Sequence, residues 1–218
     1  MKKLVIAAIG FALAVGSACG DGEPATTGPT GTTTPTLVAP MVPEGWERHI
    51  TANFQIDLPE TWEAQDLTVL PFEVLLEAVS LDFRWAALIE QFQPESFPFF
   101  AIDAESEEKI TNLSIMLRDD PIPTTISALI GGTEDLFRGT GIQVPATDSG
   151  LTIGGLEAGS MRASAPTGFF RSELVNYFVQ LSPTVVYSLV FATGADEFPA
   201  LEPVFEQIAE SFRVLDSP

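Results

Sequence analysis

The last third of the chain has a pattern that strongly restricts its fold. Three segments rich in β-branched and aromatic residues, LTIGGLEAGSMRASAP, FFRSELVNYFVQLS and TVVYSLVFATG, are each interpreted as a strand, with a tight turn at Ser182–Pro183 joining the last two. The segment FPALEPVFEQIAESFRVL follows, and its apolar residues recur at helical spacing: Leu201, Val204, Phe205, Ile208 and Phe212. Consecutive strands joined by short turns, followed by an amphipathic helix, predict an antiparallel sheet with helices packed on it, hence an α+β domain.

The middle of the chain supplies further elements of both kinds. WERHITANFQIDL predicts a hairpin of two short strands, Trp46–Ile50 and Phe54–Leu58. FPFFAIDAES and ITNLSIMLRDD predict neighbouring strands, and Thr124 or Thr125 is expected to cap a helix over TISALIGGTEDLFRGTG. Between these regions, a segment from about 67 to 98 has apolar residues at helical spacing and predicts one broken helix or two short ones.

This helical insert and the strand after it are unusually aromatic. Two interpretations stay open: the rings complete the core, or the insert helices cover an apolar groove that receives a lipid tail or a peptide. The residues concerned are Phe72, Phe83, Trp85, Phe92, Phe97, Phe99 and Phe100.

The N-terminus has the layout of a secretory signal peptide. In MKKLVIAAIGFALAVGSAC, two lysines precede an apolar run of about 15 residues, which is shorter than the roughly 20 residues that span a bilayer as a helix. VGSAC resembles the lipobox of bacterial lipoproteins, with Gly16 where leucine is commonest. The resemblance implies a signal peptide over 1–18, cleavage before Cys19, and lipid attachment at Cys19 through diacylglycerol on its thiol, with a further acyl chain such as palmitate on the new amino group.

Two other roles for Cys19 are open. An ordinary cleaved signal peptide could carry an incidental cysteine, and a catalytic thiol would need packed surroundings that lower its pKa, which this segment does not offer. Residues 19–44, rich in Gly, Pro and Thr, predict a flexible tether, and residues 45–218 a single domain. Anchor and tether together predict a cell-membrane location outside the cytoplasm, on the extracellular face or in the periplasm.

Charge and rare residues exclude several classes of function. Acids outnumber bases by 30 to 10, and loss of Lys2 and Lys3 with the signal peptide would take the formal charge from −20 to −22. Such a surface repels nucleic acid. One cysteine excludes an internal disulfide, and a single histidine, His49, excludes a metal site with several histidines.

No segment predicts catalytic, metal-binding or cofactor-binding residues. His49 would be the base of a serine–histidine–acid triad, but no G-x-S-x-G occurs, and a half-exposed histidine at a strand end is the favoured interpretation. The acids of DAESEEK (Asp103, Glu105, Glu107, Glu108) and Asp119–Asp120 lack the spacing of an EF-hand loop and are interpreted as turn acids. The stripe Glu202, Glu206 and Glu210 is interpreted as a solvated helix face or, alternatively, as a docking surface for a basic partner.

Three short segments, FQIDLPETW, GLEAGSMRAS and FEQIAESFRV, together with the order of elements, resemble the PsbP-like superfamily, which includes bacterial lipoproteins. The resemblance implies a central antiparallel sheet sandwiched between helices, and a non-enzymatic binding or assembly role. It supplies no catalytic motif, and Cys19 is the only functional residue that it transfers.

Three hypotheses of function follow. The first is a lipid-anchored, non-catalytic domain of the cell envelope that binds an unknown protein or a small apolar ligand in a sheet–helix cleft beside the insert. The second is a carboxylate-dependent hydrolase of an envelope polymer, which needs two buried carboxylates about 5–9 Å apart. The third is a lipid or acyl carrier, which needs a closed apolar cavity of about 300 Å³ or more.

Overall fold

The computed structural model describes residues 41–68, 98–106, 111–119, 122–138, 142–167 and 170–215, with side chains left aside at 165–167 and 170–171. The predicted signal peptide, Cys19, most of the predicted tether and nearly all of the helical insert lie outside these residues. Within the described residues, no helix has the length and apolar character needed to cross a bilayer.

A small three-stranded sheet brings the first and last described strands together. Its strands are β1 (Trp46–Ile50), β2 (Phe54–Pro59) and β10 (Arg213–Val214), in the order β1-β2-β10, with antiparallel pairing throughout. The predicted hairpin is confirmed, and Thr51 closes its turn by accepting hydrogen bonds from the backbone N–H groups of Asn53 and Phe54.

The large sheet has seven strands in the order β3-β4-β5-β9-β8-β7-β6, all paired antiparallel. Its members are β3 (Trp62–Asp66), β4 (Phe99–Asp103), β5 (Asn112–Asp119), β6 (Gln143–Ile153), β7 (Leu156–Thr167), β8 (Phe170–Gln180) and β9 (Val185–Gly194). The prediction of a single strand over LTIGGLEAGSMRASAP is wrong. This segment forms the end of β6, a turn and β7, because Gly154 and Gly155 adopt positive φ angles of 61° and 81° and reverse the chain.

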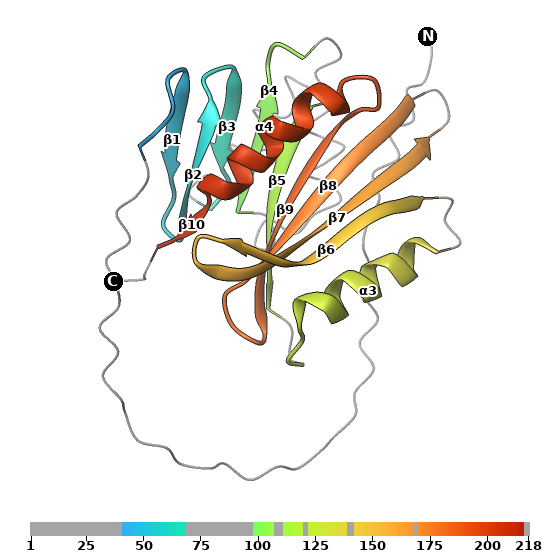
Figure 1. Ribbon diagram of the computed structural model, residues 1–218. Coiled ribbons are helices and arrows are strands. Elements are labelled where there is room, and N and C mark those ends of the chain that lie inside the picture. Colours follow the sequence, from blue (N-terminus) through green and yellow to red (C-terminus); the bar gives the residue numbers. More distant parts are fainter. Residues whose placement is uncertain are drawn as a thin grey trace, which may run out of the picture.

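Among the residues that the structure describes, one helix covers each face of this sheet. Successive residues of a strand point to opposite faces, and on β8 Tyr177 and Val179 join the cluster beneath α4 (Phe198–Ser211), whereas Phe178 joins the cluster beneath α3 (Ile126–Phe137). Figure 1 shows α4 running diagonally across the strands. The predicted α+β class, with a central antiparallel sheet sandwiched between helices, is therefore confirmed.

Local signals place both helices. Thr125 caps α3, as one of the two predicted alternatives, because its hydroxyl accepts a hydrogen bond of 3.2 Å from the N–H of Ala128. Helix α3 lies very close to β7 at Gly159, where an added Cβ would come within 2.4 Å of Cγ2 of Ile126. Helix α4 begins with Pro199 in its first turn, a position that needs no backbone N–H.

Phenylalanines fill the core beneath α4. The rings of Phe191 on β9 and Phe205 on α4 stack with centroids 4.9 Å apart. Phe54 of the small sheet meets Phe99 of the large sheet at 5.7 Å, so both sheets share one core. The burial of Phe99 and Phe100 agrees with the interpretation that aromatic residues of this region complete the core. The other five aromatic residues lie outside the described residues.

Candidate functional site

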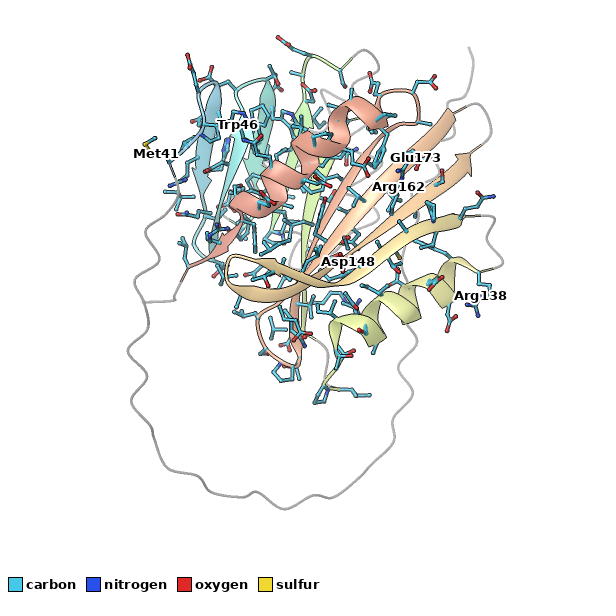
Figure 2. The ribbon with its side chains drawn as sticks, in the orientation of Figure 1. Met41, Trp46, Arg138, Asp148, Arg162 and Glu173 are labelled. Carbon is cyan, nitrogen blue, oxygen red and sulfur yellow. The ribbon has the colours of Figure 1, made fainter. Side chains whose placement is uncertain are left out.

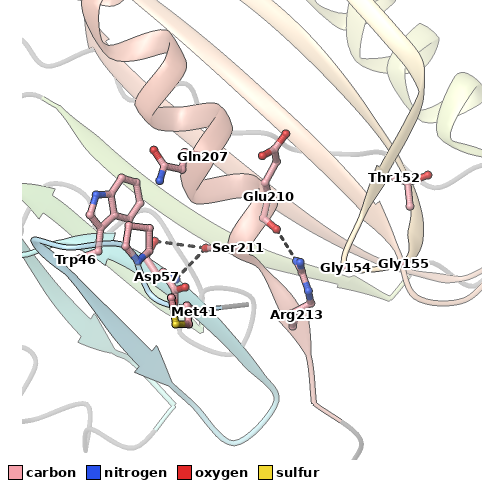
Figure 3. A pocket seen from close by; sticks show the side chains of 11 residues that line it. Met41, Trp46, Asp57, Thr152, Gly154, Gly155, Gln207, Glu210, Ser211 and Arg213 are labelled. Carbon is pink, nitrogen blue, oxygen red and sulfur yellow. Dashed lines mark hydrogen bonds between the residues drawn. The ribbon is translucent and has the colours of Figure 1, made fainter. Parts of the chain in front are cut away.

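A pocket of about 450 Å³ opens at the C-terminal end of α4, between the β1–β2 hairpin and the β6–β7 turn (Figure 3). Its walls come from segments that are far apart in the sequence. The lining residues are Met41, Pro43, Trp46, Asp57, Thr152, Gly154, Gly155, Gln207, Glu210, Ser211 and Arg213.

Asp57 and Ser211 form the rigid side of the pocket. Both oxygens of the Asp57 carboxylate accept hydrogen bonds from Arg48, at 2.7 Å from Nε and 2.8 Å from Nη2, and this side chain is only 3% exposed. The Ser211 hydroxyl accepts a hydrogen bond of 2.8 Å from the backbone N–H of Asp57 and donates one of 2.6 Å to the carbonyl of Ile208. This hydroxyl therefore links the last turn of α4 to β2.

Arg213 and Gly154 form the opposite wall. Arg213 donates from Nη1 to the carbonyl oxygens of Glu210 and Phe212, the latter at 2.7 Å, and so satisfies acceptors that the end of α4 leaves open. An added Cβ at Gly154 would lie 2.8 Å from the carbonyl oxygen of Phe212, so only glycine allows the β6–β7 turn to approach the helix end this closely.

The mouth of the pocket is mixed in character. Met41 is exposed, and Trp46 is half-buried with part of its ring against the core. Gln207 and Glu210 project from the exposed side of α4. Within the described part of the chain, the Glu210 carboxylate has no ion pair or hydrogen bond.

The chemistry of this pocket favours binding over acid–base catalysis. Of its two carboxylates only that of Asp57 is buried, and Arg48 engages both of its oxygens, so neither is oriented toward a reacting group. Glu210 is exposed. The pocket opens to the surface and has walls of mixed polar and apolar character, unlike the closed apolar cavity that a lipid carrier needs.

His49 lies elsewhere, on β1, as the predicted strand-end histidine. Its ring meets the ring of Phe99 edge-on, with centroids 6.1 Å apart. Burial lowers its pKa below the ordinary value of 6.5, against smaller opposing effects of Glu47 and Asp57. A partly buried imidazole against a phenyl ring is part of the packing.

The acids singled out in the sequence are dispersed. Asp103 ends β4, and its carboxylate accepts a hydrogen bond of 3.1 Å from the N–H of Glu105, the local bond expected of a turn acid. Asp119 ends β5, and Glu107, Glu108 and Asp120 lie outside the described residues. Among the described residues, no three His, Cys, Asp or Glu side chains are grouped so as to hold a metal ion.

The predicted acidic stripe does lie on the exposed side of α4, but its members differ. Glu202 pairs at 3.6 Å with Arg162 of β7, which also pairs at 3.3 Å with Glu173 of β8 and lies 4.2 Å above the ring of Phe198. Figure 2 shows Arg162 and Glu173 side by side on their neighbouring strands. Glu206, like Glu210, has no such partner in the described residues.

Sequence reasoning missed the residues that form the pocket. Asp57 alternates with the buried residues Ile56 and Leu58 and so points to the opposite face of β2, yet it is buried too. The available signal was the register: Arg48 lies directly opposite Asp57 in the predicted hairpin, and opposite charges facing each other across two strands pair readily.

Comparisons with known proteins give structural similarities only. No family model matches the chain, and no curated protein matches it. A cyanobacterial PsbP (CyanoP) from Synechocystis sp. PCC 6803 is similar at 14% identity and a TM-score of 0.48, over 86% of this chain and all of that one. LpqN, described as involved in cell envelope biogenesis of Mycobacterium tuberculosis, is similar at 13% identity and a TM-score of 0.49, over 75% of this chain and 83% of its own.

A third match is the Ran-binding protein Mog1p of Saccharomyces cerevisiae, at 8% identity and a TM-score of 0.46, over 75% of this chain and 91% of its own. A PsbP protein is thus among the solved structures that this chain is similar to.

Proposed function

We propose that this chain is a non-catalytic binding domain of the cell envelope, anchored through acyl chains on Cys19, and that its ligand enters the pocket at the end of α4. The observation that carries the binding role is the contrast within this pocket. Its buried polar groups bond to one another, whereas the side chains of Gln207 and Glu210 at its mouth have no hydrogen-bond partner among the described residues.

A pocket with this contrast suits recognition. The Arg48–Asp57 pair, the Ser211 hydroxyl and the Arg213 side chain fix β2, the end of α4 and the β6–β7 turn against one another. A site held in this way loses little conformational entropy when a ligand enters, which favours affinity. Gln207, Glu210 and Trp46 remain available at the mouth for contacts with the ligand.

The anchor is proposed from the N-terminal sequence. Cys19 follows the small residues of VGSAC, and the segment from there to Met41 is rich in Gly, Pro and Thr. A flexible chain of about 22 residues has a root-mean-square length of about 25 Å, comparable to the diameter of a small domain. A tether of this kind would hold the domain near the membrane and leave its pocket open to partners.

Membrane fractionation and labelling test the anchor. Wild-type protein should incorporate an alkyne analogue of palmitate and sediment with membranes, whereas Cys19→Ser should do neither. Ser17→Ala keeps a small residue before the cysteine and serves as the matched control, which should remain anchored. Equal membrane retention of Cys19→Ser and wild type would contradict lipid attachment.

The binding role is tested by photo-crosslinking in native membranes from the mouth of the pocket. A photoreactive residue in place of Gln207 should give a discrete adduct, and the same residue in place of Glu134, exposed on α3 on the other face of the sheet, should not. Absence of an adduct from both positions would overturn the binding function.

A further inference from the structure

Two carboxylates on α4, those of Glu206 and Glu210, have no ion-pair partner among the described residues, whereas Glu202 on the same helix pairs with Arg162. Glu206 and Glu210 are four residues apart and therefore neighbours on one side of the helix, where like charges repel each other. Both are exposed, and neither has a cation within the described residues.

The cations near this region are already engaged. Arg162 is held by Glu173, Glu202 and the ring of Phe198, and Arg213 donates to the last carbonyls of α4. Neither can turn to Glu206 or Glu210 without giving up these interactions. Among the described residues, no nearby cation is therefore left to pair with Glu206 or Glu210.

Tyr177 provides a second and independent observation at the same place. The residue is 7% exposed, and in the described part of the chain its hydroxyl has no hydrogen-bond partner. Among the described residues, Oγ of Ser106 is the only fully buried polar side-chain atom that has no hydrogen-bond partner. The Tyr177 hydroxyl, which also has no partner, is therefore not fully buried and reaches the surface, although its ring is buried. Tyr177 packs in the core cluster beneath α4. Burial, and then the negative charges of Glu206, Glu202 and Glu210, raise the pKa of its hydroxyl.

The pocket continues from this surface. Glu210 belongs both to the acidic side of α4 and to the pocket lining, and Trp46 lies at the mouth of the same pocket. An indole face attracts a cation and also packs against the aliphatic stem of lysine or arginine. An anionic helix side that leads to an aromatic pocket rim fits a row of basic side chains better than it fits a single ion.

We propose that the partner of this domain is a basic polypeptide segment, which lies along α4 with one cationic side chain at Glu206 and the Tyr177 hydroxyl and the next at the pocket mouth between Glu210 and Trp46. This inference rests on the proposed binding function and specifies its partner. The net charge of −20 adds long-range attraction for such a segment.

Peptide binding to the detergent-solubilised, full-length lipoprotein tests the inference. The probe is a fluorescein-labelled peptide of four Lys-Ala repeats, followed by fluorescence anisotropy, with four Glu-Ala repeats as the negative probe. We expect Glu206→Gln with Glu210→Gln to weaken binding of the lysine peptide by about tenfold or more, because two charge-assisted contacts are lost. Tyr177→Phe keeps the buried ring and should weaken binding by a smaller factor of about three.

A matched control separates local contacts from overall charge. Glu134→Gln with Asp135→Asn removes the same number of charges from exposed positions of α3, on the other face of the sheet, and should change the affinity by less than about twofold. Equal weakening by both double variants, or no binding of the lysine peptide by wild type, would overturn the inference. If the Glu206→Gln, Glu210→Gln variant loses affinity for Ca²⁺ but keeps its affinity for the lysine peptide, the two carboxylates bind a metal ion and the inference is overturned as well.

The outcomes also separate this inference from the function on which it rests. If the Gln207 crosslink forms equally in wild type and in the Glu206→Gln, Glu210→Gln variant, the domain binds a partner but not through basic side chains. If no crosslink forms at either test position, the binding function itself fails.

Discussion

The hydroxyl of Ser211 accepts a hydrogen bond of 2.8 Å from the backbone N–H of Asp57, a residue 154 positions earlier in the sequence. Through this one oxygen the end of α4 is joined to the middle of β2. The same hydroxyl donates to the carbonyl of Ile208, so it serves a helix end and a strand at once.

Replacement of this hydroxyl should therefore be costly. We expect Ser211→Ala to lower the free energy of unfolding by about 1–3 kcal/mol, because the N–H of Asp57 would be left without its partner. Urea unfolding followed by circular dichroism measures the change. Ser149→Ala, at an exposed position of β6, is the control and should have no measurable effect; an equally stable Ser211→Ala would show that water replaces the hydroxyl.

Substitution by alanine should have opposite effects on the free energy of unfolding at two glycines, Gly159 and Gly131. Gly159→Ala should lower the free energy of unfolding by about 1–3 kcal/mol, because the new Cβ would lie 2.4 Å from Cγ2 of Ile126 and 2.7 Å from the carbonyl oxygen of Asp148. At Gly131, within α3, an added Cβ would meet no atom within 4 Å beyond its chain neighbours and the backbone of its own helix, so Gly131→Ala should raise that free energy by about 0.5–1 kcal/mol. Thermal unfolding compares the two, and changes of the same sign would contradict the described contact between α3 and β7.

The single histidine predicts a pH dependence of stability. The pKa of His49 is lower in the folded protein than the ordinary value of 6.5, so below about pH 6.5 the unfolded chain binds more protons at this residue than the folded one. Stability from His49 is therefore present above pH 6.5 and decreases as the pH falls. NMR titration of the one imidazole signal should give a midpoint below 6.5, and His49→Gln should flatten the pH profile of unfolding between about pH 7 and 5.

Limited proteolysis tests the predicted tether. Its composition of Gly, Pro and Thr predicts cleavage between about Gly22 and Pro43, with a stable core as the product. Mass spectrometry of the core locates the cuts. Early cuts within β7, β8 or β9 instead would mean that the predicted domain boundary is wrong.

Local patterns explain which elements the sequence could predict. The hairpin of β1 and β2, the capping of α3 by Thr125 and the apolar side of α4 follow from periodicity and capping over a few residues, and all three are confirmed. The β-branched and aromatic residues around Gly154 and Gly155 predict one strand, but these two adjacent glycines are a turn signal and form the β6–β7 hairpin. Strand β10 has two residues, and its pairing with β2 leaves no local signal.

The pocket was beyond prediction for a related reason. Trp46, Gly154 and Ser211 meet there only because of the tertiary fold, and none belongs to a motif with fixed spacing. By contrast, the acidic stripe of α4 was visible in the sequence, because residues four apart share one side of a helix. Only the structure distinguishes the paired Glu202 from Glu206 and Glu210.

The pairing of β10 with β2 also determines when the domain can finish folding. Val214 lies opposite Phe54, and the N–H of Leu215 donates at 2.8 Å to the carbonyl of Asn53, so one edge of β2 stays open until residues 213–215 have been synthesised. Contacts between residues this far apart in sequence form late, because the chain between them must first be ordered. For a chain exported as proposed above, such a delay would keep the emerging chain unfolded enough for translocation, and the small sheet would be completed on the far side of the membrane.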